Sequence, residues 1–129
     1  RKDDSDSTML STALREAEEE IGIVPEDVDV FGELDDVPTV SGYLISPFVG
    51  IIPEAYEFKP NRQEVSQLLE VPMSALIDEK NLRDEMRLVE GKLVNRISYA
   101  YDGYLIYGAT AIVLSGFLRL LNYELSGST

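Results

Sequence analysis

Three glutamates in one short stretch offer the clearest prospect of chemistry in this chain. Residues 15–23 read Arg-Glu-Ala-Glu-Glu-Glu-Ile-Gly-Ile, and Glu16, Glu19 and Glu20 stand at positions i, i+3 and i+4. Residues at that spacing share one face of an α-helix, where like charges repel each other. A divalent cation bound by carboxylate oxygens would turn this repulsion into attraction. The stretch therefore predicts either a Mg²⁺ or Mn²⁺ site that handles phosphate oxygens, or an acidic face exposed to solvent.

The residues around these acids predict a helix at about residues 8–22 that positions them. An apolar stripe runs at helical spacing beside the acids and consists of Leu10, Ala13, Leu14, Ala17 and Ile21. Arg15 lies one turn before Glu19, where it can orient a carboxylate or form an ordinary ion pair. Gly22 is expected to end the helix in a left-handed conformation. The N-cap is expected among Ser5, Asp6, Ser7 and Thr8.

The remaining elements alternate between strands and helices and predict an α/β fold. Strands are expected at residues 28–34, 43–52 and 55–58, a strand entry at 65–71, and a hairpin from 87–89 and 93–99. A short helix is expected at residues 72–77 and a deeply packed closing helix at 107–123. Pro47 predicts a bulge or an edge position in its strand. This order suits an α/β/α sandwich around a mixed β-sheet, and residues 1–129 are expected to form a single domain.

Composition excludes several kinds of chemistry. The 129 residues include no cysteine and no histidine, which removes Ser-His-Asp triads, Cys-His pairs, and thiolate or imidazole metal ligands. A net charge of −13, from 24 acidic and 11 basic residues, argues against nucleic-acid binding. No targeting segment is apparent, and polar or small residues interrupt the apolar stretch 104–121. We therefore expect a cytoplasmic protein with no membrane partner.

The acidic helix also resembles a known motif. Its residues Arg15-Glu16-Ala17-x-Glu19-Glu20-x-Gly22-Ile23 match the second half of the Nudix box, GX5EX7REUXEEXGU, in which U is aliphatic. The first half does not match at strict spacing. The coenzyme A pyrophosphatase branch of the Nudix hydrolases has a longer box with two aspartates, and Asp3 and Asp6 fill those places. The chain resembles this branch from a point just after its paired glycines.

Three further stretches resemble the same branch. Residues 41–50 resemble its central strand, residues 61–65 with 69–73 its "NPDEV…VPL" segment, and residues 104–111 the segment that opens its last helix. The resemblance covers residues 3 to about 121, and the family's N-terminal strands and paired glycines are lacking. It implies a Nudix-type fold and metal-dependent hydrolysis of a nucleoside-diphosphate-linked substrate. The substrate it implies is coenzyme A or an acyl derivative, cut to 3′,5′-ADP and 4′-phosphopantetheine.

The resemblance also implies roles for particular residues. Glu16 and Glu20 are the expected direct ligands of Mg²⁺ or Mn²⁺, Glu19 assists directly or through water, and Arg15 positions Glu16. Glu64 follows a Pro-Asn turn and is expected either as a catalytic base or further metal ligand, or as a solvated side chain.

Other residues are weaker candidates. The bases expected to meet the 3′-phosphate of a coenzyme are Lys59, Arg62, Arg83 and Arg96. Tyr104 and Tyr107 are expected in the core, with a pocket-lining position as the alternative for Tyr107. Asp6 stands where other Nudix boxes have their first glutamate, or else caps the helix.

Two other functions stay open at this point. One is a Nudix hydrolase of ADP-ribose or another nucleoside diphosphate, which relative rates on a small substrate panel would separate from a coenzyme A hydrolase. The other is a non-catalytic Nudix-like module that binds a nucleotide or a protein. The expected partner is a small-molecule nucleotide that resembles coenzyme A, and the fold is compatible with a homodimer.

Overall fold

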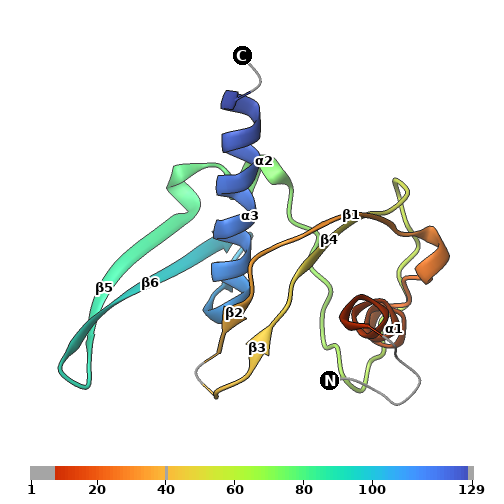
Figure 1. Cartoon of the computed structure of the whole chain (residues 1–129), viewed down its shortest axis with the longest axis horizontal. Helices are drawn as coiled ribbons and strands as arrows, with labels where there is room; N and C mark the ends of the chain where they lie inside the picture. Colours follow the sequence, from red (N-terminus) through yellow and green to blue (C-terminus); the bar gives the residue numbers. More distant parts are fainter. Residues whose placement is uncertain (1–7, 40, 128–129) are drawn as a thin grey trace. The chain divides into compact units, whose positions relative to one another are not determined.

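Three α-helices, two short 3-10 helices and seven strands form in the part of the chain that the computed structural model describes, residues 8–39 and 41–127. Figure 1 colours the chain along its sequence and labels the α-helices and most of the strands. The α/β fold class predicted from the sequence is confirmed. The strands form two two-stranded sheets and one three-stranded sheet. Within the described residues each strand pairing is antiparallel, although the sequence predicted a mixed sheet.

The chain divides into two compact units and passes between them more than once. Unit 1 contains the described residues up to Leu34 together with Ser46–Leu69, and unit 2 contains Asp35–Ile45 and the described residues from Glu70 onward. Neither unit is a continuous stretch of sequence. The single domain expected for residues 1–129 stays a prediction.

The acidic helix of unit 1 forms as predicted, as α1 (Met9–Ile21). It begins after Thr8, whose hydroxyl accepts a hydrogen bond from the Ser11 N–H at 3.0 Å. It ends at Gly22, which has a φ of 76° and donates its N–H to the Glu18 carbonyl at 3.0 Å. Thr8 and Gly22 were both predicted as caps, and the other three N-cap candidates lie outside the described residues.

A two-stranded sheet completes the regular structure of unit 1. β1 (Asp29–Glu33) corresponds to the strand predicted at 28–34 and pairs with β4 (Phe48–Ile51) in antiparallel register. The register shifts between Val30 and Gly32, which marks a bulge. The 3-10 helix η1 (Pro25–Asp27) connects α1 to β1.

The long strand predicted at 43–52 is broken in two at Pro47. Its first part, β3 (Leu44–Ile45), pairs with β2 (Val37–Pro38) in unit 2, while β4 pairs with β1 in unit 1. Pro47 has no N–H to continue a ladder, although its carbonyl accepts a hydrogen bond from the Leu34 N–H at 3.0 Å. The sequence therefore predicted an irregularity here, but not a change of partner.

The segment after β4 is a loop, so the strands predicted at 55–58 and 65–71 are wrong. Ala55 has a φ of 56°, which is incompatible with an extended strand. The Val65 N–H donates to the Asn61 carbonyl at 2.7 Å and closes a turn. The backbone hydrogen bonds that this loop donates therefore close local turns or reach α1 instead of joining a sheet.

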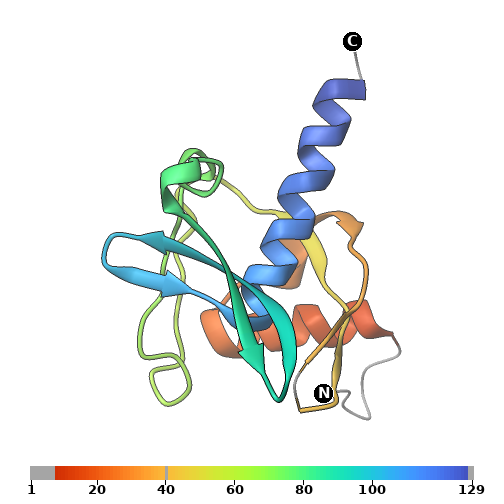
Figure 2. The same ribbon diagram turned by 90° about the vertical axis from the view of Figure 1, so that its left-hand side faces the viewer.

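Unit 2 is built on a three-stranded antiparallel sheet. β5 (Leu82–Val89), β6 (Lys92–Tyr101) and β7 (Tyr104–Ile106) pair in that order. The turns Glu90-Gly91 and Asp102-Gly103 have positive φ at both residues, as two-residue hairpin turns require. The predicted hairpin is confirmed and is longer than predicted. Figure 2 shows the twisted β5–β6 ribbon and the start of the last helix.

Two helices pack on this sheet to form the core of unit 2. The short helix α2 (Met73–Leu76) follows Pro72, as predicted, and η2 (Glu79–Asn81) leads into β5. The closing helix is α3 (Gly108–Gly127). The buried cluster consists of Leu76, Tyr99 and Ala111, with Val71, Ile97, Ile106, Leu114 and Leu118 packed against it.

The predicted deep packing of α3 holds for one face of the helix only. Ala111 is fully buried, while Ile112 and Leu120 are 48% and 52% exposed. In the part of the chain that the structure describes, no helix is both long enough and apolar enough to cross a membrane.

Candidate active site

The three predicted metal ligands lie on α1 together with Arg15. The Arg15 guanidinium forms an ion pair with Glu19 at 2.9 Å between Nη1 and Oε1, and the two side chains are 24% and 58% exposed. Glu16 is half-buried, whereas Glu19 and Glu20 are exposed. The helix therefore offers carboxylate oxygens to solvent and fixes one of them in place. The sequence predicted that Arg15 positions Glu16, or else that it forms an ordinary ion pair along the helix. The ion pair with Glu19 is observed, and the positioning role toward Glu16 stays a prediction.

The loop after β4 packs against the C-terminal end of α1. The Lys59 N–H donates to the Ile21 carbonyl at 2.9 Å, and the Asn61 N–H donates to the Glu20 carbonyl at 2.8 Å. A Cβ at Gly22 would lie 2.7 Å from the Lys59 Cβ, so only glycine allows this approach. Two of the helix's last carbonyls are thereby satisfied by the loop.

Glu64 belongs to the turn that this contact anchors. Its N–H donates to the Asn61 carbonyl at 3.0 Å, and the Asn61 N–H is the group bonded to Glu20. Glu64 itself is exposed. The structure thus brings the turn of Glu64 to the end of α1, while the catalytic or metal-binding role of its carboxylate stays a prediction. Asn61 was not singled out from the sequence, because its contribution is a backbone N–H that any residue except proline could supply.

The chemistry of these side chains suits a hard divalent ion, because carboxylate oxygens are the ligands that Mg²⁺ and Mn²⁺ prefer. Among the side chains that the structure describes, however, no three acidic ones lie close enough together to hold an ion. Carboxylates at i, i+3 and i+4 repel one another, so their convergence requires the positive charge of a cation. Asp3 and Asp6, the two aspartates of the longer box, lie outside the described residues. The carboxylate oxygens of α1 are thus of the kind that binds Mg²⁺ or Mn²⁺.

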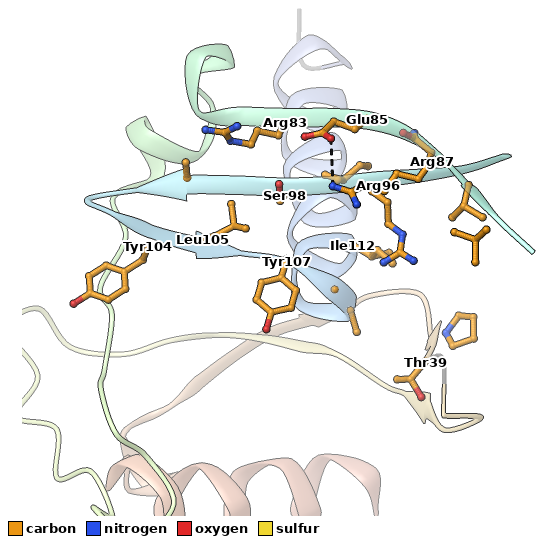
Figure 3. Close-up of a pocket in the computed structure, with 18 of the residues that line it drawn as sticks. Thr39, Arg83, Glu85, Arg87, Arg96, Ser98, Tyr104, Leu105, Tyr107 and Ile112 are labelled. Carbon is orange, nitrogen blue, oxygen red and sulfur yellow. Dashed lines mark ion pairs between the residues drawn. The ribbon is translucent and has the colours of Figure 1, made fainter.

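A hollow lies wholly within unit 2. It is lined by two of the predicted phosphate-binding bases, Arg83 and Arg96, and also by Arg87 (Figure 3). The other two predicted bases, Lys59 and Arg62, belong to the loop of unit 1. Arg87 was missed, although its alternation with Arg83 along one strand was a signal that both share a face.

Both tyrosines that were expected in the core line this hollow instead. Tyr104 is 41% exposed and Tyr107 is 70% exposed. Tyr107 comes just before α3, outside the helix that buries Ala111, so it does not reach the cluster around Tyr99. The expected core position is therefore wrong, and the pocket position weighed for Tyr107 is the one observed.

Comparison with known families identifies the acidic helix as part of a known domain. Residues 3–93 match the model of the NUDIX domain, and this range includes α1, β1, β4, β5 and the first two residues of β6. The chain belongs to the Nudix family. Nudix hydrolases generally use divalent metal ions such as Mg²⁺ or Mn²⁺ and act on small-molecule nucleotides.

Curated Nudix relatives are similar over much of the chain. A protein of Photorhabdus laumondii named as an uncharacterized Nudix hydrolase, NudL, is 34% identical over 112 residues, which is 87% of this chain and 60% of the relative. Proteins of the same name from Escherichia coli and Shigella boydii are each 44% identical over 72 residues, or 56% of this chain and 38% of the relative. The chain thus spans between about two fifths and three fifths of the length of these relatives.

Proposed function

We propose that this chain catalyses the metal-dependent hydrolysis of a nucleoside-diphosphate-linked substrate, and that the substrate is coenzyme A or an acyl-coenzyme A. The products would be 3′,5′-ADP and 4′-phosphopantetheine. One observation carries the proposal: the second half of the Nudix box lies in register on α1, with Arg15 paired to Glu19 and the turn of Glu64 bound to the helix end. The choice of coenzyme A is supported by the resemblance of residues 41–50, 61–73 and 104–111 to the corresponding branch.

The residues of α1 would bind the metal ion and orient its ligands. The carboxylates of Glu16 and Glu20 would hold Mg²⁺ or Mn²⁺, and Glu19 would assist directly or through water. Such an ion, when bound, polarises a pyrophosphate and makes water more acidic. Arg15 holds the Glu19 carboxylate at 2.9 Å and limits its freedom to rotate. Glu64 would either accept the proton that the attacking water loses or supply a further oxygen ligand.

The proposal also covers both units of the chain. The family match at residues 3–93 runs through unit 1 and into unit 2 without a break. This supports the inference that residues 1–129 belong to one Nudix domain. A homodimer remains part of the proposal, as does a small-molecule nucleotide that resembles coenzyme A as the partner.

Product identification by mass spectrometry tests this function. The purified protein is incubated with coenzyme A and, in parallel, with ADP-ribose, each in the presence of Mg²⁺ or Mn²⁺ and again with EDTA. We expect metal-dependent release of 4′-phosphopantetheine from coenzyme A that is faster than any cleavage of ADP-ribose. Faster cleavage of ADP-ribose would keep the Nudix chemistry and reject the coenzyme. If neither substrate is cleaved, the proposal fails, and a non-catalytic binding module or a hydrolase of another nucleoside diphosphate takes its place.

A further inference from the structure

The hollow in unit 2 gathers positive charge on a chain whose net charge is −13. It has a volume of about 1080 Å³, which is enough for a nucleotide-sized ligand. Its charged lining residues are three arginines and one glutamate, Arg83, Arg87, Arg96 and Glu85. An excess of positive charge within such an acidic protein implies an anionic ligand, because the arginines would otherwise be expected to pair with the abundant acids.

Strand register explains how these four side chains meet on one face of the sheet. Arg83, Glu85 and Arg87 alternate along β5, so their side chains point to the same side. On β6, Arg96 stands opposite Glu85 and Ser98 stands opposite Arg83. Residues that face each other across an antiparallel pair share a face of the sheet. Figure 3 shows the arginines spread along the two strands, with the tyrosines on the side of β7.

The arginines are only partly neutralised. Glu85 forms an ion pair with Arg87 at 3.6 Å, and the two side chains are 53% and 65% exposed. In the portion of the chain that the structure describes, no ion pair involves Arg83 or Arg96. Two guanidinium groups are thus left to meet a ligand. A guanidinium binds a phosphate through two parallel hydrogen bonds, a geometry that lysine cannot offer.

Two other features of the hollow suit a phosphorylated nucleotide. Tyr107, which is 70% exposed, presents an aromatic ring on which a base can stack. Gly108 and Ala109, the first two residues of α3, also line the hollow. The start of a helix carries partial positive charge and unpaired N–H groups, both of which attract phosphate. The lining therefore combines groups for a phosphate with a ring for a base.

We infer that this hollow binds a nucleotide that carries more than one phosphate, with Arg83 and Arg96 on a phosphate and Tyr107 against the base. The inference deepens the proposed function, and rests on it only for the source of the nucleotide. That source is either the adenosine end of the substrate or a separate nucleotide that regulates the protein. The binding itself needs no metal and no turnover.

Binding of 3′,5′-ADP to the whole 129-residue chain in the presence of EDTA tests the inference. Isothermal titration calorimetry compares the wild type with Arg83→Gln, Arg96→Gln and the control Lys92→Gln. Lys92 belongs to the same hairpin but does not line the hollow. We expect each arginine variant to bind about tenfold more weakly, since each loses a charge-assisted contact, and the control to bind as the wild type does. Equal losses in all three variants, or no binding to the wild type at millimolar nucleotide, would overturn the inference.

A variant that binds 3′,5′-ADP more tightly provides a second test, because misfolding would weaken binding and not strengthen it. Glu85→Gln removes the one negative charge of the lining and releases Arg87, so 3′,5′-ADP should bind about threefold to tenfold more tightly. Unchanged or weaker binding by a variant with a wild-type unfolding temperature would contradict the inference. Adenosine has no phosphate, so its dissociation constant should be the same for the wild type and for every variant.

Kinetics on coenzyme A then identify the source of the nucleotide. If the hollow holds the substrate, Arg83→Gln and Arg96→Gln raise KM for coenzyme A with little change in kcat. If it holds a separate nucleotide, KM stays the same and the response to added 3′,5′-ADP is lost. Both results support the site. Absence of hydrolysis in the wild type would remove the proposed function while leaving the binding result in EDTA intact.

Discussion

Glu20 combines a structural and a chemical role in one residue. Its backbone carbonyl accepts the Asn61 N–H at 2.8 Å and so holds the loop of Glu64, while its carboxylate is exposed on the acidic face of α1. A substitution that changes only the side chain separates these roles, because the backbone contact survives it.

Changing Glu20→Gln should reduce kcat for coenzyme A by at least about a hundredfold, since the amide keeps the shape of the side chain but loses the charge that attracts a divalent ion. The unfolding free energy should stay within about 0.5 kcal/mol of the wild type, as for other exposed positions. Steady-state kinetics and urea denaturation measure the two effects. Glu18→Gln, on the same helix at a position that the motif leaves variable, is the matched control and should retain activity. Turnover that survives Glu20→Gln would show that the metal assignment is wrong.

Arg15→Lys tests whether the ion pair with Glu19 serves catalysis or only the helix. Lysine keeps the charge but cannot hold a carboxylate in the planar geometry of a guanidinium. We expect the concentration of Mg²⁺ that gives half-maximal activity to rise by about tenfold or more, as for other groups that orient metal ligands. Stability should change by less than about 0.5 kcal/mol, because exposed i,i+4 pairs contribute little. If the Mg²⁺ concentration for half-maximal activity does not change, Arg15 only forms an ordinary ion pair within the helix.

At the scale of elements, the junction between α1 and the loop after β4 depends on Gly22. This residue has a φ of 76°, and a Cβ there would lie 2.7 Å from the Lys59 Cβ and 2.9 Å from the Lys59 nitrogen. A side chain would therefore be strained by its backbone conformation and would also push the loop away from the helix.

Gly22→Ala should destabilise the protein by about 1–3 kcal/mol and lower activity, because the loop that carries Glu64 must shift. Gly116→Ala is the contrasting change. Gly116 lies inside α3, and a Cβ there would meet no atom within 4 Å. This variant should gain about 0.5–1 kcal/mol of stability from better helix propensity. Denaturation curves give both values, and a Gly22→Ala variant as stable as the wild type would refute the packing argument.

The same loop is also tied to η1 through Tyr56. The Val24 N–H donates to the Tyr56 hydroxyl at 2.9 Å, and the hydroxyl donates to Asp27 Oδ2 at 2.8 Å. The Val24 N–H by itself lowers the pKa of Tyr56. The hydrogen bond to Asp27, desolvation, and the negative charges of Asp27 and Glu18 outweigh it and raise the pKa above the usual 10.0.

A raised pKa makes this contact sensitive to alkaline pH. The folded state holds the hydroxyl proton more tightly than the unfolded state, so its contribution is complete below about pH 10 and is lost as pH rises through the folded pKa. Tyr56→Phe lacks this proton. The gap in unfolding temperature between the wild type and Tyr56→Phe should be constant from about pH 7 to 9 and should shrink above about pH 10. A gap that widens at high pH would show that the sign is wrong.

At the scale of the whole molecule, charge governs how the chain meets its ligands. A net charge of −13 repels phosphates, and the acidic face of α1 adds to this repulsion locally. Arginines that line the hollow of unit 2 are a local exception. A divalent ion would neutralise the acidic face, so it should stabilise the folded chain as well as support catalysis.

Mg²⁺ should accordingly raise the unfolding temperature. Site-specific binding at about a hundred times the dissociation constant contributes about 2.7 kcal/mol, and EDTA should remove that gain. Differential scanning calorimetry in Mg²⁺, compared with NaCl at equal ionic strength, separates site binding from general screening. Glu20→Gln should keep the response to salt and lose the specific response to Mg²⁺. If NaCl stabilises as much as Mg²⁺ does, no specific site contributes to folding.

Much of this molecule is determined by local sequence. The apolar stripe, a capping hydroxyl and Gly22 specify α1, and two-residue turns at Glu90-Gly91 and Asp102-Gly103 specify the hairpins of unit 2. These signals act over a few residues, through periodicity and backbone conformation, so the sequence carries them completely. The spacing of the Nudix box falls in the same class, since one helix presents all of its residues.

Only the tertiary structure decided which distant segments meet. Strand pairing at Pro47, the loop at residues 55–71 and the exposure of Tyr107 depend on partners far along the chain, where local propensity has little influence. The turn of Glu64 meets α1 through backbone N–H groups, which every residue except proline possesses. Arg87 joins Arg83 and Arg96 because of strand register. Register and backbone contacts leave little trace in residue type, and for this reason the sequence predicted the acidic helix but not the arginine-lined hollow.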